Sequence, residues 1–136
     1  MMFTTKTEYG LRALVRLAKN NKKKIKKPLS LTEISNLEHI SRSYLEHIFK
    51  KLKEDDLVKS VKGVEGGYVL SREPKKIDLF QIVEALEGPL AVFYCMASDE
   101  NKMTCSVKGC LTRKVWDELQ INIIKTLKKF KLSDLI

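Results

Sequence analysis

Three cysteines lie close together in this sequence, and the rest of the chain has none. Cys95, Cys105 and Cys110 fall within sixteen residues, around a polar stretch, ASDENKMT, that has neither a helical nor a strand period. A cysteine in a protein core usually behaves as a small apolar residue within a periodic stripe. These three do not follow such a stripe. Their confinement to one segment therefore predicts a role as metal ligands or as reactive thiols.

The spacing C-x9-C-x4-C bears on which metal these thiols would bind. Structural zinc sites favour short C-x(2–4)-C pairs and take four protein ligands, so the segment offers one short pair and one thiol too few. An iron–sulfur cluster accepts wider spacing because its metals are spread over a scaffold of sulfide ions, and soft thiolates suit it equally well. We expect a cluster with a non-cysteine fourth ligand, which leaves one corner open to a small oxidant or nitric oxide. Bare redox thiols or a zinc site are the alternative.

The charge of the chain points to a polyanionic partner. Lys and Arg number 26 against 17 Asp and Glu, which gives the 136 residues a net charge of +9. Nucleic acid is the first candidate and a membrane surface the second, although a lysine-rich protein without such a partner has the same composition. No run approaches the roughly 18 apolar residues of a membrane span, and the N-terminus lacks the apolar stretch of a secretory signal. We therefore expect a cytoplasmic protein that is not a membrane protein.

Two short helices joined by a turn precede the cysteine segment. Ser30 and Glu33 form a capping box that opens a helix with Ile34 and Leu37 facing inward. A second helix covers residues 42–54, where apolar residues recur at the spacing of a single helix face. Two helices joined by so short a turn predict a helix-turn-helix, although an ordinary helix pair has the same spacing.

A β-hairpin after these helices makes the prediction more specific. The runs LVKSV and YVL read as strands, and KGVEGG between them reads as the turn. Glycines such as Gly63 allow the positive φ that a tight reversal needs. The stretch TKTEYGLRALVRLAKNN near the start of the chain also has the period of a helix. Helix, helix, recognition helix and hairpin, in that order, predict a mainly α fold of the winged helix-turn-helix type over residues 1–74.

The second half of the chain divides into three further segments. Residues 75–92 should form a connecting helix that begins at Asp78 and ends at Gly88. Residues 93–111 form the cysteine segment, predicted to be a cluster-binding loop. Residues 112–136 should form a long helix and a tail, and the apolar residues of this helix cover more than one face. Such a helix exceeds what one small domain can bury, so we expect it to pack against a second copy in a homodimer.

The second helix of a helix-turn-helix lies in the major groove, where its N-terminal residues reach base edges. Arg42 can bind guanine through two hydrogen bonds, and Glu46 can accept one from cytosine. Lysines set affinity through phosphate contacts. Tyr44 has an alternative role, packing at the helix-turn-helix junction. The residues predicted to contact double-stranded operator DNA are Ser41, Arg42, Ser43, Tyr44, Glu46, Lys50, Lys59 and Lys62.

Catalysis is not expected from this sequence. No histidine or glutamine near the cysteines supplies a base, and no glycine-rich loop opens a helix to cradle a phosphate. We therefore predict no catalytic residues and no enzyme.

Four stretches carry a resemblance to a known family: TKTEYGLRALVRLA, ISRSYLEHIFKKLKEDDLVKSVKGVEGGYVLS, IDLFQIVEALEGP and CLTRKVWDEL. Together they make the chain similar, nearly end to end, to the Rrf2-type winged-helix repressors, the family of IscR, NsrR and RirA. The resemblance implies a homodimer, crossed through its long C-terminal helices, that binds palindromic operators as a repressor. It also implies that Cys95, Cys105 and Cys110 hold an iron–sulfur cluster whose state governs DNA binding, so that the regulator senses redox state, nitric oxide or iron supply.

Some positions depart from the family pattern. The histidine that ligates a [2Fe–2S] cluster in IscR-like members is replaced by Arg113. NsrR-like members use an acidic residue in the first helix of the partner subunit as the fourth ligand, and the resemblance places Glu8 at that position. A [4Fe–4S] cluster is therefore favoured over [2Fe–2S]. In the hairpin, Lys62 replaces the usual arginine, while Val64 and Glu65 replace Pro and Gly at the tip, where a glutamate should repel phosphate.

Overall fold

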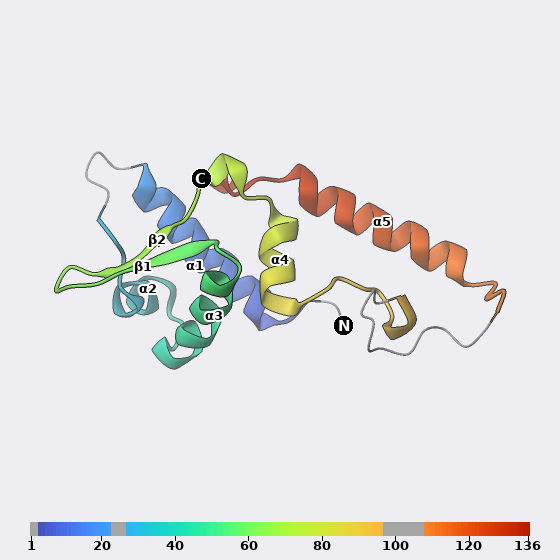
Figure 1. Ribbon diagram of the computed structural model, residues 1–136, viewed down its shortest axis with the longest axis horizontal. Coiled ribbons are helices and arrows are strands. Elements are labelled where there is room, and N and C mark those ends of the chain that lie inside the picture. The colour runs from blue at the N-terminus through green and yellow to red at the C-terminus, as the bar shows by residue number, and fades with distance from the viewer. Residues whose placement is uncertain (1–2, 23–26, 97–107) are drawn as a thin grey trace.

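Five α-helices and one antiparallel hairpin make up the part of the chain that the computed structural model describes, residues 3–22, 27–96 and 108–136 (Figure 1). This confirms the predicted mainly α fold with a small hairpin. The elements in chain order are α1 (Thr5–Asn21), α2 (Leu31–Glu38), α3 (Arg42–Glu54), β1 (Val58–Val61), β2 (Gly67–Leu70), α4 (Leu79–Glu87) and α5 (Arg113–Lys129). Among the described helices, none has the length and apolar character that crossing a bilayer requires.

The predicted helix boundaries depend on local side-chain caps. The Ser30 Oγ accepts a hydrogen bond from the Glu33 amide at 3.1 Å, and the Glu33 carboxylate accepts one from the Ser30 amide at 2.7 Å. This reciprocal pair is the capping box expected at the start of α2. Asp78 caps α4 in the same way, and Gly88, with φ of 85°, ends that helix. All of these boundaries are confirmed.

The core forms around α1, which α3 and α4 contact from two sides. Leu14 of α1 and Phe49 of α3 are fully buried. The approach of α4 depends on Gly10, because a Cβ at that position would lie 2.4 Å from the Leu86 Cδ1. The remaining buried residues of α3 are those of its predicted apolar face, Leu45, Ile48 and Leu52.

The inward face of α2 differs from the prediction. Ile34 is buried as expected, but Leu37 is 49% exposed. Its place is taken by Glu38, which is buried with Leu31 and Ile34 at helical spacing. The rotation has an electrostatic cause, because two arginines of α1 hold the Glu38 carboxylate inside, as described below.

The hairpin forms as the sequence predicts, with Val58 paired to Leu70 and Val61 to Gly67. It is tied to the segment before α2 by an isolated bridge between Leu29 and Tyr68. Gly67 has φ of 155°, and a Cβ there would lie 2.3 Å from the Leu29 carbonyl oxygen. A glycine is therefore required at this position for the hairpin to pack beside the start of α2.

The C-terminal helix α5 begins far from the other helices and runs back toward them, so that its C-terminal end meets the rest of the molecule (Figure 1). None of the α5 residues is fully buried, and Val115 and Ile121 are 61% and 63% exposed. After α5, the Leu132 amide donates to the Ile77 carbonyl at 2.8 Å, and the Leu132 side chain is completely buried in the core that contains α1. The tail thus anchors the C-terminal end of α5 to the helix-turn-helix domain, while no residue along α5 is buried.

Candidate nucleic-acid interface and cysteine site

The outer face of α3 presents the predicted base-contacting residues. Because the apolar residues of α3 face the core, Arg42, Ser43, Glu46 and Lys50 are all exposed. The helix begins beside its cap, the Ser41 Oγ, which accepts from the Tyr44 amide at 3.3 Å. The structure therefore places these side chains together on one open surface along α3.

Arg42 is oriented by two neighbours. Its Nη1 donates to the Thr32 Oγ1 of α2 at 3.1 Å, and its Nε lies 3.6 Å from the Glu46 carboxylate one turn further along α3. Both partners of the ion pair are more than half exposed. The guanidinium thus lies at the joint between α2 and α3, with its direction set but its surface accessible.

Tyr44 is half-buried and packs against Tyr9 of α1, with ring centroids 5.6 Å apart and the rings nearly perpendicular. This is the packing role that the sequence offered as an alternative to DNA contact. Edge-to-face pairs of this kind stabilise a junction by about 0.5–1.5 kcal/mol beyond their buried area.

The hairpin carries further lysines beside this surface. Lys59 and Lys62 are exposed, and Lys53 at the end of α3 donates to the Ser60 Oγ of β1 at 2.9 Å. At the tip, Glu65 lies 3.7 Å from Lys27, and this exposed ion pair reduces the negative charge that Glu65 presents to a phosphate backbone.

The helix-turn-helix is fastened to α1 by a buried carboxylate. The Glu38 side chain is only 10% exposed, and it accepts from the Nε of Arg12 at 3.0 Å and from the Nε of Arg16. Burial alone would raise the pKa of Glu38, but the hydrogen bonds and charges of Arg16 and Arg12 outweigh it and lower the pKa. The carboxylate therefore stays ionised and clamps α2 onto α1.

The sequence patterns considered above do not predict this cluster of Glu38, Arg12 and Arg16, although a signal for it exists. Arg12 and Arg16 are one turn apart on α1, and Glu38 is four residues after the inward-facing Ile34. A charged residue on an apolar face, together with two like charges at i and i+4 elsewhere, is typical of a buried ion pair.

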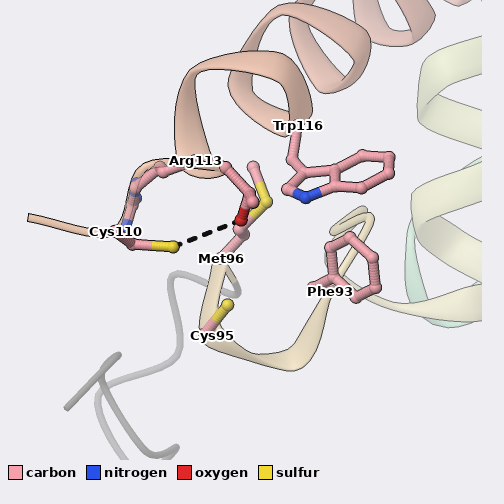
Figure 2. A pocket seen from close by; sticks show the side chains of 7 residues that line it. Phe93, Cys95, Met96, Cys110, Arg113 and Trp116 are labelled. Atoms are coloured by element: carbon pink, nitrogen blue, oxygen red, sulfur yellow. Dashed lines mark hydrogen bonds between the residues drawn. The ribbon is translucent and has the colours of Figure 1, made fainter. Parts of the chain in front are cut away.

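The second candidate site is a cavity of about 220 Å³ between the cysteine segment and the start of α5 (Figure 2). Cys95 and Met96 come from the short helical turn Tyr94–Met96, while Cys110 lies three residues before the first residue of α5, Arg113. Phe93 and Trp116 close another side, with ring centroids 4.9 Å apart. The structure therefore brings together two of the three predicted thiols from segments fifteen positions apart.

The Cys110 thiol lies in a polarised setting. Its Sγ is 3.3 Å from the Thr112 Oγ1. The hydrogen bond from Thr112, supported by the backbone amides and charge at the start of α5, lowers the pKa of the Cys110 thiol. A thiol of lowered pKa is a better metal ligand and nucleophile at neutral pH because a larger share of it is thiolate. Arg113, which replaces the histidine of IscR-like members, lines the same cavity and lies 3.4 Å from Asp117.

The other two predicted cluster ligands are Cys105 and Glu8. Cys105 lies outside the described residues. Glu8 is exposed near the start of α1, and among the described residues no hydrogen bond or ion pair joins it to Cys95 or Cys110. Its role as a ligand supplied by a partner subunit stays a prediction.

The cavity is connected to α5 and then to α4. The Val92 amide donates to the Gln120 Oε1 of α5 at 3.1 Å, next to the contact of Phe93 with Trp116. Two residues before Val92 and three residues after the end of α4, Leu90 is buried. The chain from α4 to the cysteines is therefore partly buried and hydrogen-bonded to α5.

The end of α4 in turn contacts both α3 and α1. The Lys51 Nζ of α3 donates to the Leu86 carbonyl at 3.1 Å. The Glu87 carboxylate accepts from the hydroxyls of Thr4 and Thr7 at 2.6 and 2.7 Å. One short stretch of α4 thus joins the recognition helix, the start of α1 and the segment that leads to the cysteines.

Helix, helix, exposed recognition helix and hairpin define the class of winged helix-turn-helix DNA-binding proteins. The match of residues 3–136 to the profile described as "Rrf2: Iron-dependent Transcriptional regulator" shows that this chain belongs to the Rrf2 family. It is therefore a transcriptional regulator of a family that binds DNA and is not enzymatic, as the sequence predicts.

Individual relatives agree with this assignment. The chain is 35% identical to the HTH-type transcriptional regulator IscR of Cereibacter sphaeroides over 136 residues, covering 100% of this chain and 87% of the relative. Among solved structures, it is similar to CymR, named the global cysteine regulator of B. subtilis, with a TM-score of 0.82, 30% identity and coverage of 99% and 95%. The T. potens IscR structure has a TM-score of 0.78, 31% identity and coverage of 99% and 85%.

Proposed function

We propose that this regulator is a cytoplasmic, homodimeric repressor whose binding to a palindromic operator is set by an iron–sulfur cluster on Cys95, Cys105 and Cys110. The observation that carries the sensing part is the convergence of Cys95 and Cys110 on one cavity at the start of α5. The relatives named IscR support a cluster on these thiols. The cytoplasmic location follows from the DNA partner.

In this proposal α3 reads the operator. Arg42 binds guanine, Glu46 selects against a wrong base, and Ser41 and Ser43 contact the same groove. The hydroxyl of Tyr44 approaches the DNA while its ring packs on α1. Lys50, Lys59 and Lys62 neutralise phosphates and make binding dependent on salt.

The donor set fits a sulfur-bound cluster. Cys95 and Cys110 both line the cavity, and the lowered pKa of Cys110 favours the thiolate that such a group requires. We favour [4Fe–4S] over [2Fe–2S], with the Glu8 carboxylate of a second subunit as fourth ligand. A bound cluster would supply a redox-active group that oxidants, nitric oxide or iron shortage can remove.

The exposed length of α5 supports dimerisation. Leu119, Ile121 and Val115 present apolar surface that the single chain leaves in water. Packing α5 against its copy would bury this surface and bring the two winged heads to a fixed spacing. That spacing suits an operator whose half-sites are about one helical turn apart.

The experiment compares operator binding with cluster content. The protein is purified anaerobically, and its iron content, sulfide content and visible absorption are measured. The same measurements are then made on Cys105→Ser and Glu8→Ala. A brown protein with iron and sulfide that Cys105→Ser loses supports the proposal, and loss in Glu8→Ala supports the fourth ligand. A wild-type protein that stays colourless after reconstitution with iron and sulfide would refute the proposed iron–sulfur cluster.

The DNA-reading part is tested separately. Arg42→Ala should weaken operator binding by about 1–3 kcal/mol and relax specificity at one base. Lys50→Ala should weaken binding to every DNA sequence alike and reduce the slope of log binding constant against log salt concentration by about 1. Lys125→Ala on α5, an equally exposed lysine away from this surface, is the matched control. Equal effects of Lys50→Ala and Lys125→Ala would contradict the assigned surface.

A second candidate is a regulator that uses its cysteines as bare redox thiols or binds zinc through them. The hydrogen bond that lowers the pKa of Cys110 favours reactive thiols, and the chain is also similar to CymR. A colourless, iron-free protein whose operator affinity changes on oxidation would support the thiol version, and bound zinc would support the metal version.

A further inference from the structure

One side chain of the cysteine cavity has no part in the proposed cluster. Met96 follows Cys95 directly and lines the same cavity as both described thiols (Figure 2). Methionine thioethers bind soft metal ions, whereas hard cations prefer oxygen. Among the lining residues, the Thr112 hydroxyl is the one side-chain oxygen, so the described walls suit a soft ion and not a hard one.

We infer that Cys95, Met96 and Cys110 form a binding site for a soft monovalent metal ion, Cu(I), with Ag(I) as its inert analogue. Two thiolates and one thioether make an all-sulfur donor set, which is the kind that selects Cu(I). Zinc would need a fourth protein ligand. The inference does not rest on the proposed cluster, since it requires neither Cys105 nor Glu8.

Binding of a monovalent ion leaves the site with a single negative charge. Binding releases one proton from each of Cys95 and Cys110, so the two thiolates carry a charge of −2, and the metal ion contributes +1. The Arg113 guanidinium lines the same cavity, but its ion pair with Asp117 at 3.4 Å offsets its charge. No electron is transferred, because the metal is bound as Cu(I) and stays Cu(I).

The aromatic side of the cavity favours the same ion. Trp116 and Phe93 pack edge to face and form an apolar wall of the cavity. A monovalent ion loses less hydration free energy on leaving water than a divalent ion does, and the face of an indole attracts a cation within about 6 Å of its centre. Trp116 is the one tryptophan of the chain, so its fluorescence reports directly on the occupancy of this cavity.

The test uses the full-length, reduced, metal-free protein under anaerobic conditions. Cu(I) is titrated against a colorimetric Cu(I) chelator while near-ultraviolet thiolate–Cu(I) absorption and Trp116 fluorescence are recorded, and Ag(I) is titrated in parallel. We expect one ion per chain, with quenching of Trp116 that ends at the same equivalence point. Binding of less than one ion per chain, or unchanged Trp116 fluorescence, would overturn the inference.

Three variants separate this site from adventitious binding to thiols. Cys110→Ser should abolish binding at one equivalent. Met96→Leu keeps the size of the side chain but removes the sulfur, and should weaken Cu(I) binding at least about tenfold, the effect that even outer partners of metal sites have. Cys105→Ser should bind Cu(I) as the wild type does. Wild-type affinity in Met96→Leu, or loss of binding in Cys105→Ser, refutes the site, and circular dichroism of each variant checks that the fold is retained.

The same variants distinguish this inference from the proposed cluster. After reconstitution with iron and sulfide, the cluster requires Cys105 and should be retained in Met96→Leu. A protein that binds Cu(I) but takes up no iron supports the Cu(I) site and refutes the proposed cluster. A protein that takes up iron but lacks the Met96-dependent Cu(I) site supports the cluster and refutes the Cu(I) site.

Discussion

Replacing Glu38 with glutamine tests whether the buried carboxylate clamps the helix-turn-helix to α1. Glutamine keeps the shape and one acceptor oxygen. Its NH2 group, however, would face the N–H of one arginine Nε, so that two donors meet and no carboxylate oxygen is left to accept. The two hydrogen bonds between charged partners, from Arg12 and Arg16, therefore become one weaker bond to a neutral oxygen and one unfavourable contact.

The expected loss of stability follows from the burial of the three groups. Breaking a fully buried ion pair costs about 3–5 kcal/mol. Here the carboxylate is 10% exposed, but Arg12 and Arg16 are 39% and 36% exposed, so solvent recovers part of the loss. We expect Glu38→Gln to lower the free energy of unfolding by about 1.5 kcal/mol, which is about 5 °C in Tm for a chain of this size.

The pH dependence gives this prediction a specific sign. The pKa of Glu38 is lowered in the folded state, because the arginine hydrogen bonds outweigh the effect of burial. A lowered folded pKa contributes stability above the unfolded pKa, and that stability is lost as pH falls through the folded pKa. The difference in free energy of unfolding between wild type and Glu38→Gln should therefore reach its full size at pH 7 and become smaller as the pH falls through the pKa of folded Glu38.

Urea unfolding at several pH values, with Glu84→Gln as the control on an exposed site of α4, measures both effects. The control should stay within about 0.5 kcal/mol of the wild type, as surface substitutions do. Equal stabilities of the two variants at pH 7 would show that the arginines contribute nothing through Glu38. A difference that persists unchanged below the pKa would show that packing, and not charge, is responsible.

The other predictions concern the hairpin, the tail and the thiol. Gly67→Ala should destabilise the fold by about 2 kcal/mol or more in urea unfolding, because the added Cβ meets a backbone carbonyl at 2.3 Å in a strained conformation. Leu132→Ala should cost about 3 kcal/mol, as a fully buried leucine does, whereas Leu135→Ala, 39% exposed, should cost far less. In the metal-free protein, Thr112→Val should shift alkylation of Cys110 to higher pH, since the hydroxyl that lowers the thiol pKa is removed; an unchanged pH profile would contradict that role.

The elements whose determinants are local could be predicted from the sequence. The capping pair Ser30 and Glu33 and the stop at Gly88 act within one or two turns, so their residue types indicate the helix ends directly. The hairpin follows from strand-forming runs around glycines for the same reason. The outward face of α3 was also predictable, because its apolar stripe leaves Arg42 and Glu46 outside.

Features that depend on contacts between distant segments were not predictable. The inward face of α2 was assigned to Leu37 on apolarity alone, and it turned toward Glu38 because arginines 22 and 26 positions away bind that carboxylate. The return of Leu132 to the core and the pairing of Phe93 with Trp116 likewise depend on where α5 runs. Sequence spacing identified the cysteines as a group, but the Met96 wall of their cavity needed the structure.

The way the cysteine site can influence DNA reading follows from what the end of α4 touches. Lys51, on the inner side of the recognition helix, donates to the carbonyl of Leu86, so α3 cannot shift without moving this end of α4. Glu87 is fixed by Thr4 and Thr7 at the start of α1, where Glu8 would meet a partner subunit. A change at the cavity that moves Val92 and Phe93 would therefore act on a joint that contacts both α3 and α1. Such a joint transmits a change only if it has two stable arrangements, and we propose that the long, unburied α5, packed against a second chain, provides them.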